Sequence, residues 1–356
     1  MNGKNSSSSP KVLFVLKKRD VSWGDNVYGK GFSSGLLNSA SFVCNMLKNE
    51  GIGSKLVEVV DNNCIDKEVT LFKPTHVIIE AYWVLPEKFE VLTKLNPKVI
   101  WIIRNHSEIP FLANEGIAME WSRRYANYKN VYVSCNNLRC MDSFNTFIPK
   151  HKNVYLPNFY PVTGKNSNLD IFFEFLKFRK CSNNPLHIAC PGAIRPLKNH
   201  LLQAIAALKV GEELNRKMYF HINGSRLEMN GSNILKNLRA LFDNNPLGEL
   251  VEEPWANHED FKKRLQGMDA VMQVSYSETF NIVGADAVDV GVPLISSSEL
   301  QWSNKMYQAD FNDVNDIAEK LKRAILVPYS ASYARRLLKN HVKNVPNIWM
   351  DVLLTT

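Results

Sequence analysis

Residues 271–297 read VMQVSYSETFNIVGADAVDVGVPLISS, and this stretch decides the fold. It contains a buried strand, a polar turn, a helix, a Gly-Val-Pro stop at 291–293 and a second buried strand. The polar turn carries Glu278, and Asp286 follows eight positions later. Because two helical turns cover about seven residues, we expect both carboxylates on one helix face. Helix N-terminal amides beside the first acid would suit an anionic ligand, so the stretch predicts a site for hydroxyls and phosphate.

Length and composition place the chain among soluble globular proteins. Its 356 residues suffice for two ordinary domains, and 45% hydrophobic with 22% charged residues is typical of neither disordered nor membrane proteins. No apolar run approaches the roughly 18 residues that a spanning helix needs. The formal net charge of +8 favours anionic partners such as phosphates, nucleic acid or anionic membranes. Many soluble proteins carry such a charge without any specific partner.

The N-terminus and the cysteines bear on the cellular compartment. Residues 1–10 are polar and Ser-rich without an apolar core, so we expect a disordered leader rather than a secretory signal. The cysteines form no CxxC pair and no His/Cys cluster; they are Cys44, Cys64, Cys135, Cys140, Cys181 and Cys190. We therefore expect a reduced, cytoplasmic protein without a structural metal.

Two series of apolar strands alternate with helix candidates along the chain. The first series has strand candidates at 11–16, 55–60, 76–81, 99–103 and 131–135, and the second at 186–190, 218–222, 250–253 and within 271–297. Such alternation predicts an α/β fold with two doubly wound, Rossmann-like domains facing a cleft, followed by C-terminal helices. We place the N-terminal, acceptor-side domain at 11–160 and the C-terminal domain at 161–330. A helical tail at 331–356 could pack back on the N-terminal domain.

A basic loop follows the first strand of the second domain. Residues 192–199 read GAIRPLKN, with Arg195 and Lys198 three positions apart. Ligands of such sheets bind beyond the carboxyl ends of the strands. Two cations there fit a diphosphate, and the glycine allows close approach to the backbone. The alternative is a loop with two solvated charges.

These pieces together resemble the retaining nucleotide-sugar glycosyltransferases of GT-B fold, the group 1 transferases with an E-x7-E motif. The resemblance covers about residues 153–303 and rests on the basic loop, on 275–280, on 291–293, on HINGS at 221–225 and on Pro157-Asn158. It implies that Arg195 and Lys198 bind the donor diphosphate. Glu278 would then hold sugar hydroxyls and Asp286 the ribose.

The resemblance implies a donor site of eleven residues: Gly192, Arg195, Lys198, Asn223, Gly224, Glu278, Thr279, Phe280, Asn281, Ile282 and Asp286. Asp286 departs from the family pattern, because it is one methylene shorter than the usual Glu and reaches roughly 1.5 Å less. Ala193 stands where an Arg is common, and Val274 where a Pro is usual. These departures leave the donor nucleotide open.

One histidine of the first domain matches the family placement. Residues 104–108 read RNHSE after a strand, and family members often place a histidine there that points at the transferred sugar. His106 therefore joins Glu278, Arg195 and Lys198 as a catalytic candidate, with Arg104 and Glu108 as neighbours that could orient it. A structural histidine is the alternative.

The acceptor side has a weaker pattern. Lys17, Lys18 and Arg19 end the first strand, and Gly31 lies in a glycine-rich loop, 23–32, that does not match GxGxxG. A phosphate-bearing acceptor such as DNA would be attracted there. The alternative is a solvated charge run.

Resemblance thus implies transfer of a sugar from a nucleoside diphosphate sugar to an acceptor hydroxyl, with retention, without metal and without a cofactor. The acceptor could be hydroxylated bases of phage or viral DNA, or a polysaccharide or lipid. A hypothesis from another class is a non-catalytic module of the same fold that only binds nucleotide or nucleic acid.

Overall fold

The computed structural model describes residues 9–18, 22–23, 26–27, 35–164, 184–327 and 330–356. These residues form two compact units. Unit 1 comprises the described residues of Met1–Val21, Ser34–Tyr160 and Val342–Thr356, and unit 2 those of Ser22–Ser33 and Pro161–His341. Most of the expected disordered leader, together with Cys181, Arg19 and Gly31, lies outside the described residues.

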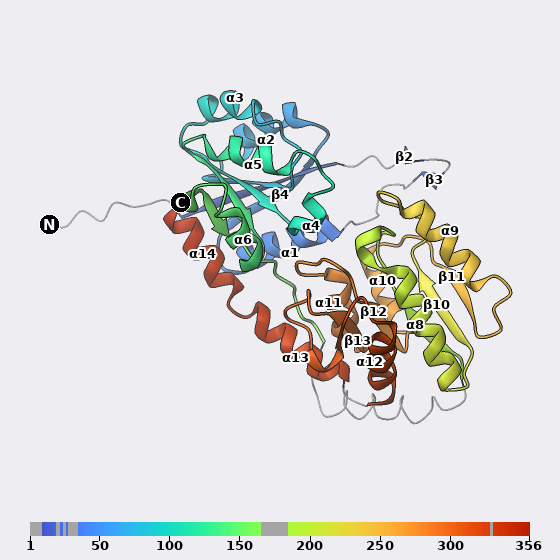
Figure 1. The fold of residues 1–356 in the computed structure, drawn as a ribbon. Helices are drawn as coiled ribbons and strands as arrows, with labels where there is room; N and C mark the ends of the chain where they lie inside the picture. The colour runs from blue at the N-terminus through green and yellow to red at the C-terminus, as the bar shows by residue number, and fades with distance from the viewer. Residues whose placement is uncertain (1–8, 19–21, 24–25, 28–34, 165–183, 328–329) are drawn as a thin grey trace. The chain divides into compact units, whose positions relative to one another are not determined.

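The described part of unit 1 contains a parallel six-stranded sheet with the order β4-β1-β5-β6-β7-β8 (Figure 1). Its strands are β1 (Lys11–Lys17), β4 (Gly53–Val59), β5 (His76–Glu80), β6 (Ile100–Asn105), β7 (Val131–Cys135) and β8 (Asn153–Tyr155). Its helices are α1 (Gly35–Asn49), α2 (Ile65–Phe72), α3 (Lys88–Leu95), α4 (Ile109–Leu112), α5 (Ala118–Ala126), α6 (Leu138–Phe144) and α14 (Val345–Thr355).

Both faces of this sheet are covered, as the sequence of β1 requires. Side chains of a strand alternate between faces. Leu13 and Val15 pack in the core that α2, α3, α5 and α6 share. Phe14 points to the other face, where its ring lies 5.9 Å from that of Trp349 in α14. A strand buried on both faces reads as a continuous apolar run, and β1 reads KVLFVLK.

Unit 2 repeats this architecture with the strand order β11-β10-β9-β12-β13-β14, again parallel in the described residues. The strands are β9 (Leu186–Ala189), β10 (Met218–Ile222), β11 (Gly248–Glu252), β12 (Ala270–Gln273), β13 (Leu294–Ser297) and β14 (Gln308–Ala309). The helices are α8 (His200–Glu213), α9 (Gly231–Phe242), α10 (His258–Leu265), α11 (Ile282–Asp289), α12 (Val314–Leu326) and α13 (Ser330–Val342). The short strands β2 (Ser22–Trp23) and β3 (Asn26–Val27) pair separately and antiparallel.

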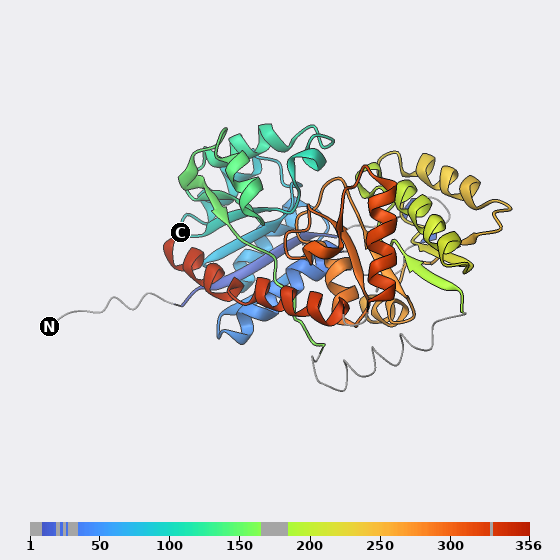
Figure 2. The same cartoon turned by 60° about the horizontal axis from the view of Figure 1, so that its bottom comes forward.

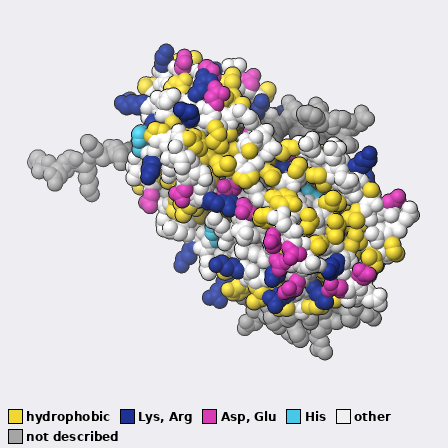
Figure 3. Space-filling view, viewed as in Figure 1, with side chains coloured by type: hydrophobic (Ala, Val, Ile, Leu, Met, Phe, Trp, Pro, Cys, Tyr) yellow, Lys and Arg dark blue, Asp and Glu magenta, His cyan; other side chains and the backbone are white. Residues whose placement is uncertain are grey.

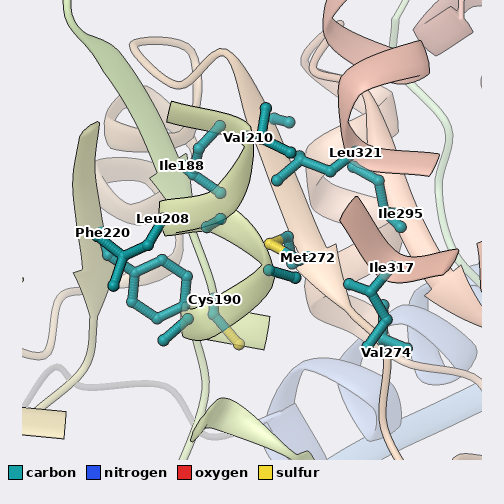
Figure 4. Packing of buried hydrophobic residues seen from close by; sticks show 14 of the residues in the cluster. Ile188, Cys190, Leu208, Val210, Phe220, Met272, Val274, Ile295, Ile317 and Leu321 are labelled. Atoms are coloured by element: carbon teal, nitrogen blue, oxygen red, sulfur yellow. The ribbon is translucent and has the colours of Figure 1, made fainter. Parts of the chain in front are cut away.

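The core of unit 2 lies between one face of its sheet and the helices α8, α9 and α12. Helices α8 and α12 run side by side on this face (Figure 2). Figure 4 shows how Met272 of β12 packs among side chains from neighbouring strands and from both helices. This packing fixes the strands, so the loops at their carboxyl ends start from rigid positions.

The segment after residue 330 is divided between the two units. Helix α13 lies in unit 2 up to His341, whereas α14 belongs to unit 1. No helix in the described part of the chain is both long and apolar enough to cross a membrane.

Candidate functional site

The order of strands in unit 2 defines where a ligand would bind. β9 comes first in the chain, β10 and β11 lie on one side of it, and β12 to β14 lie on the other. The loops after β9 and β12 therefore leave the sheet in opposite directions. In open parallel sheets, ligands bind at the carboxyl ends of the strands at this switch point. The candidate loops of the sequence, 192–199 and 274–281, are the loops that meet there.

Hydrogen bonds fasten these two loops to one another. Tyr276 N donates to Leu197 O at 2.9 Å, and Asn199 Nδ2 donates to Val274 O at 3.2 Å. Asn199 has a positive φ of 55°, a left-handed conformation that Asn tolerates better than most residues. Gln203 adds an acceptor for Val274 N at 2.8 Å. The two loops therefore form one rigid structure at the carboxyl ends of the strands, which we call the loop edge.

Lys198 and Glu278 form an ion pair on this edge. Their side chains are only 12% and 8% exposed. Lys198 Nζ also donates to Gln273 Oε1 at 3.3 Å, and the same oxygen accepts from Asn281 Nδ2 at 2.9 Å. A buried charge must be paired and hydrogen-bonded, and these contacts supply both requirements. The structure thus brings together a cation and an acid that the sequence places 80 residues apart.

The expectation that Glu278 and Asp286 share one helix is wrong. Glu278 lies in the loop before α11, which begins at Ile282. Asn281 caps the helix with a positive φ of 59°, and its Oδ1 accepts from Gly284 N at 2.8 Å. The cap redirects the backbone, so spacing along a continuous helix does not relate the two acids.

Asp286 points from α11 toward α10. Its Oδ1 lies 2.7 Å from His258 Nε2, and its side chain is 2% exposed against 24% for His258. No motif in the sequence indicates His258 as a site residue. The local signal is Asn257, whose side chain caps α10 and fixes His258 as the first helical residue. The pairing itself depends on how α10 packs against α11.

Two glycines of the predicted donor site, Gly192 and Gly224, allow neighbouring residues of unit 2 to approach the backbone closely. Gly192 has φ +119°, a region that side chains rarely adopt, and its N–H donates to Asn223 Oδ1 at 2.8 Å. A Cβ on Gly224 would lie 2.3 Å from Glu252 Oε2. Asn223 thus lies beside the loop that follows β9, as the pairing of β9 and β10 requires, and Gly224 lies beside the end of β11.

Arg195 lies on the same loop and contacts an acid that sequence analysis does not identify. Its Nη1 is 2.8 Å from Glu228 Oε2. Arg226 contacts the other oxygen of Glu228 at 2.6 Å. Phe280 is buried, packs 6.1 Å from the Trp302 ring and accepts a hydrogen bond from Trp302 Nε1 through its carbonyl. Its position therefore supports the loop between Thr279 and Ile282, the first residue of α11.

His106 of unit 1 is held by a residue other than those expected. Its Nε2 contacts Glu80 Oε2, and Arg104 Nη1 lies 3.2 Å from the other oxygen of Glu80. Glu108, which we expected beside His106, contacts Arg139 instead at 3.0 Å. The reason is sheet register, since Glu80 at the end of β5 pairs with Arg104 of β6.

The charges of this cluster are set by burial and by each other. Burial would raise the pKa of Glu80, but Arg104 and His106 outweigh it and the pKa lies below its usual value. Burial and the charge of Arg104 lower the pKa of His106. Glu80 is therefore an anion and His106 neutral at pH 7, which places the ring proton on Nε2.

Arg104 also connects Pro157 and Asn158 to α14. Its Nη2 donates to Asn158 Oδ1 at 2.7 Å and to Pro157 O at 3.4 Å. Trp349 Nε1 of α14 donates to the same Pro157 carbonyl at 2.9 Å, and its ring lies 5.1 Å from the Arg104 guanidinium. These contacts all lie within unit 1.

Lys17 and Lys18 are exposed at the carboxyl end of β1, where Lys18 N donates to Val59 O at 2.7 Å. The acceptor-side interpretation of Lys17 and Lys18 stays a prediction.

The described cysteines Cys44, Cys64, Cys135, Cys140 and Cys190 are free thiols.

Comparison with known proteins places the fold. No protein-family model and no curated protein matches the sequence. HepE of Anabaena in complex with UDP-glucose matches with a TM-score of 0.65 at 12% identity, over 98% of this chain and 100% of that chain. A glycosyltransferase of Rickettsia africae matches with a TM-score of 0.62 at 14% identity, over 98% and 100%. A UDP-forming α,α-trehalose-phosphate synthase of Burkholderia vietnamiensis matches with 0.57 at 10%, over 78% and 73%.

These structures are GT-B glycosyltransferases. The prediction of an α/β fold with two doubly wound sheets is confirmed: two parallel six-stranded sheets with interleaved helices in the described residues match the GT-B neighbours.

Proposed function

We propose that this protein transfers a sugar from a UDP-sugar to an acceptor hydroxyl. The observation that carries the proposal is the buried Lys198–Glu278 pair at the switch point of unit 2. A cation and an acid side by side supply what a nucleotide sugar needs, a phosphate partner and a hydroxyl partner. The UDP and UDP-glucose bound by HepE support uridine diphosphate as the nucleotide.

Each residue of the edge has a proposed task. Lys198 and Arg195 neutralise the diphosphate, whose negative charge grows as the sugar leaves. Glu278 accepts hydrogen bonds from sugar hydroxyls, and Asp286 binds the ribose. The amides at the start of α11 add a positive helix end, and Gly192 leaves space for the phosphates.

The proposed reaction retains the configuration at the anomeric carbon. The bond from that carbon to the diphosphate oxygen breaks, and the acceptor oxygen bonds to the same face. The acceptor proton passes to the departing diphosphate oxygen, which removes the need for a separate base. We propose His106 as the unit 1 residue that contacts the transferred sugar. The cations of the protein take the place of a metal in this proposal.

For the acceptor, we propose hydroxylated DNA bases. Lys17 and Lys18 support this proposal as adjacent exposed cations at the carboxyl end of β1. On the face shown in Figure 3, basic and acidic side chains are intermixed rather than gathered into one basic surface. The acceptor proposal therefore depends on the local pair and not on a broad positive face.

The test separates donor from acceptor. Hydrolysis of UDP-sugars without acceptor is measured first for the wild type and for Glu278→Gln. Transfer is then measured onto hydroxymethylated DNA, unmodified DNA, polysaccharide and lipid. We expect slow hydrolysis that the substitution abolishes, and transfer only to hydroxymethylated DNA. Absence of nucleotide-sugar binding would leave the non-catalytic alternative, and transfer to polysaccharide or lipid would replace the DNA proposal.

A further inference from the structure

The segment after β10 is fastened onto the loop after β9. Ile194 N donates to Arg226 O at 2.9 Å, and Glu228 N donates to Ile194 O at 3.0 Å. Ile194 and Leu227 form an isolated parallel bridge. Gly231, the first residue of α9, permits this approach, because a Cβ there would lie 2.2 Å from Ile194 O. The backbone therefore fixes the side chains on both sides of the bridge against one another.

Two guanidinium groups share one carboxylate at this bridge. Arg195 Nη1 lies 2.8 Å from Glu228 Oε2. Arg226 donates to Oε1 through Nε at 3.0 Å and Nη2 at 2.6 Å. Burial would raise the pKa of Glu228, but Arg226 and Arg195 outweigh it and the pKa is lowered. Glu228 thus contacts both arginines, one through each carboxylate oxygen.

The plane of the Arg226 guanidinium is fixed from another side. Its central carbon lies 4.9 Å from the centre of the Trp255 ring. A guanidinium over an aromatic face is held by cation–π attraction while its edge stays able to donate hydrogen bonds. The side chains of Arg195 and Arg226 are 21% and 28% exposed, so both can be reached from solvent.

A buried ring nearby reports a positive potential. The pKa of His200 falls to about 3, first because the ring is buried and then because Lys198 and Arg195 are positive. Cations that disfavour protonation of a buried imidazole also favour an anion at the same edge.

We propose that Arg226 and Arg195 form a phosphate-binding fork that Glu228 keeps in place. The ligand is a phosphoryl group, whose oxygens accept the paired N–H groups of a guanidinium. It comes either from the donor diphosphate or from a phosphate on the acceptor. The two sources rest on the proposed function, whereas the contacts that form the fork do not depend on it.

The first test measures binding of inorganic pyrophosphate to the full chain by calorimetry. Arg226→Gln is expected to weaken binding at least about tenfold, because it removes a charge-assisted bidentate donor. Glu228→Gln is expected to strengthen binding, because the amide oxygen can still accept a hydrogen bond that holds a guanidinium in place, while the competing negative charge is removed. Arg216→Gln is the matched control, because it removes the same charge. Arg216 lies just before Met218, at the amino-terminal end of β10 and away from the loops at the carboxyl ends of the strands.

Opposite effects of the Arg226 and Glu228 variants distinguish a binding role from damage to the fold. Equal weakening by both variants, or an Arg226→Gln affinity equal to that of Arg216→Gln, overturns the fork. Thermal melting of each variant shows whether the chain is folded. An Arg226→Lys variant, which keeps the charge without the fork, is expected to recover only part of the affinity.

The second test separates the two sources. If the donor supplies the phosphoryl group, Arg226→Gln weakens UDP binding and leaves uridine binding unchanged. If the acceptor supplies it, Arg226→Gln leaves UDP binding unchanged, but inorganic phosphate no longer binds the UDP-saturated variant. Arg226-dependent binding of pyrophosphate without any UDP binding would defeat the proposed function and leave the fork. If UDP binds but the affinities for pyrophosphate and phosphate do not depend on Arg226, the proposed function stands and the fork is overturned.

Discussion

His258 Nε2 lies 2.7 Å from Asp286 Oδ1, so an imidazole occupies the space in front of the shorter acid. A glutamate at this position would extend the carboxylate by roughly 1.5 Å, about one C–C bond. That length cannot be added without displacing His258. The aspartate is thus fitted to the histidine of α10 and not simply a shortened version of the family residue.

This fit predicts that Asp286→Glu lowers the affinity for UDP, although it restores the residue common in the resembled family. We expect a loss of about tenfold, because the longer side chain must move His258 or leave its rotamer. His258→Ala combined with Asp286→Glu should recover binding. Calorimetric titration with UDP measures both. Unchanged affinity in the single variant would show that the pair is not under this constraint.

The Lys198–Glu278 pair predicts a large effect on turnover and a coupled effect on stability. Under the proposed function, Lys198→Met and Glu278→Gln should each lower kcat by about 100-fold or more, because each would remove a charge proposed to act on the departing diphosphate or the sugar. A double-mutant cycle on the free energy of unfolding should give a coupling of about 1–3 kcal/mol. The exposed pair Lys217–Glu249 is the control, with a coupling below about 0.5 kcal/mol.

The Glu80–His106 contact predicts a change in histidine titration that a purely structural role would not produce. Glu80 raises the pKa of His106 against burial and Arg104, so Glu80→Gln should lower that pKa further. The proton should also redistribute between the ring nitrogens, which nitrogen NMR detects. We expect kcat to fall about tenfold or more, with a smaller effect on KM. Glu87→Gln, an exposed glutamate of the same unit, should change neither quantity.

The lowered pKa of His200 predicts the direction in which this residue changes the stability of the protein with pH. Its pKa falls from 6.5 to about 3 on folding, so the unfolded chain binds the proton more tightly. Stability from this group is complete above pH 6.5 and declines as the pH falls toward 3. Between pH 7 and 5 the loss should be about 2 kcal/mol. Denaturant titrations of His200→Gln should lack this part of the decline, and an identical pH slope would contradict the assignment.

Trp349 predicts that α14 contributes to the stability of unit 1. Trp349→Phe keeps an aromatic ring but removes the donor to Pro157 O, leaving a buried carbonyl with one partner fewer. We expect a loss of about 1–3 kcal/mol in the free energy of unfolding. Leu354→Ala on the exposed side of the same helix should stay within about 0.5 kcal/mol. Equal effects of the two substitutions would show that the hydrogen bond contributes nothing.

Apolar runs predict the strands well because these strands are buried on both faces. The sequence places β7 at Val131–Cys135 and β10 at Met218–Ile222, with the bounds that the structure has. In the tail, the pattern predicts a helix from about Ser332 to Lys343, which corresponds to α13, but it does not predict α14 as a separate helix. Helix α14 buries few side chains, among them Trp349 and Leu353, and gives only a short apolar stripe.

The loops of the candidate site follow from motifs, but their partners do not. Lys198 and Glu278 belong to segments that carry a pattern of their own. Glu80, Glu228 and His258 are defined by strand register and helix packing, which no local pattern encodes. Sequence spacing also fails for Glu278 and Asp286, because the cap at Asn281 interrupts the helix on which that spacing depends.

The position of α14 has a consequence for the order in which the protein folds during synthesis. β1 is translated early, whereas the tryptophan that packs on Phe14 and bonds Pro157 is translated after the whole of unit 2. Until α14 is made, the apolar side chains that it covers on this face, Phe14 among them, are open to water or to a chaperone, although α1 already packs on β1 and β4. Unit 2 can complete its sheet sooner. Folding of unit 1 is therefore completed only after the strands of unit 2 have been made.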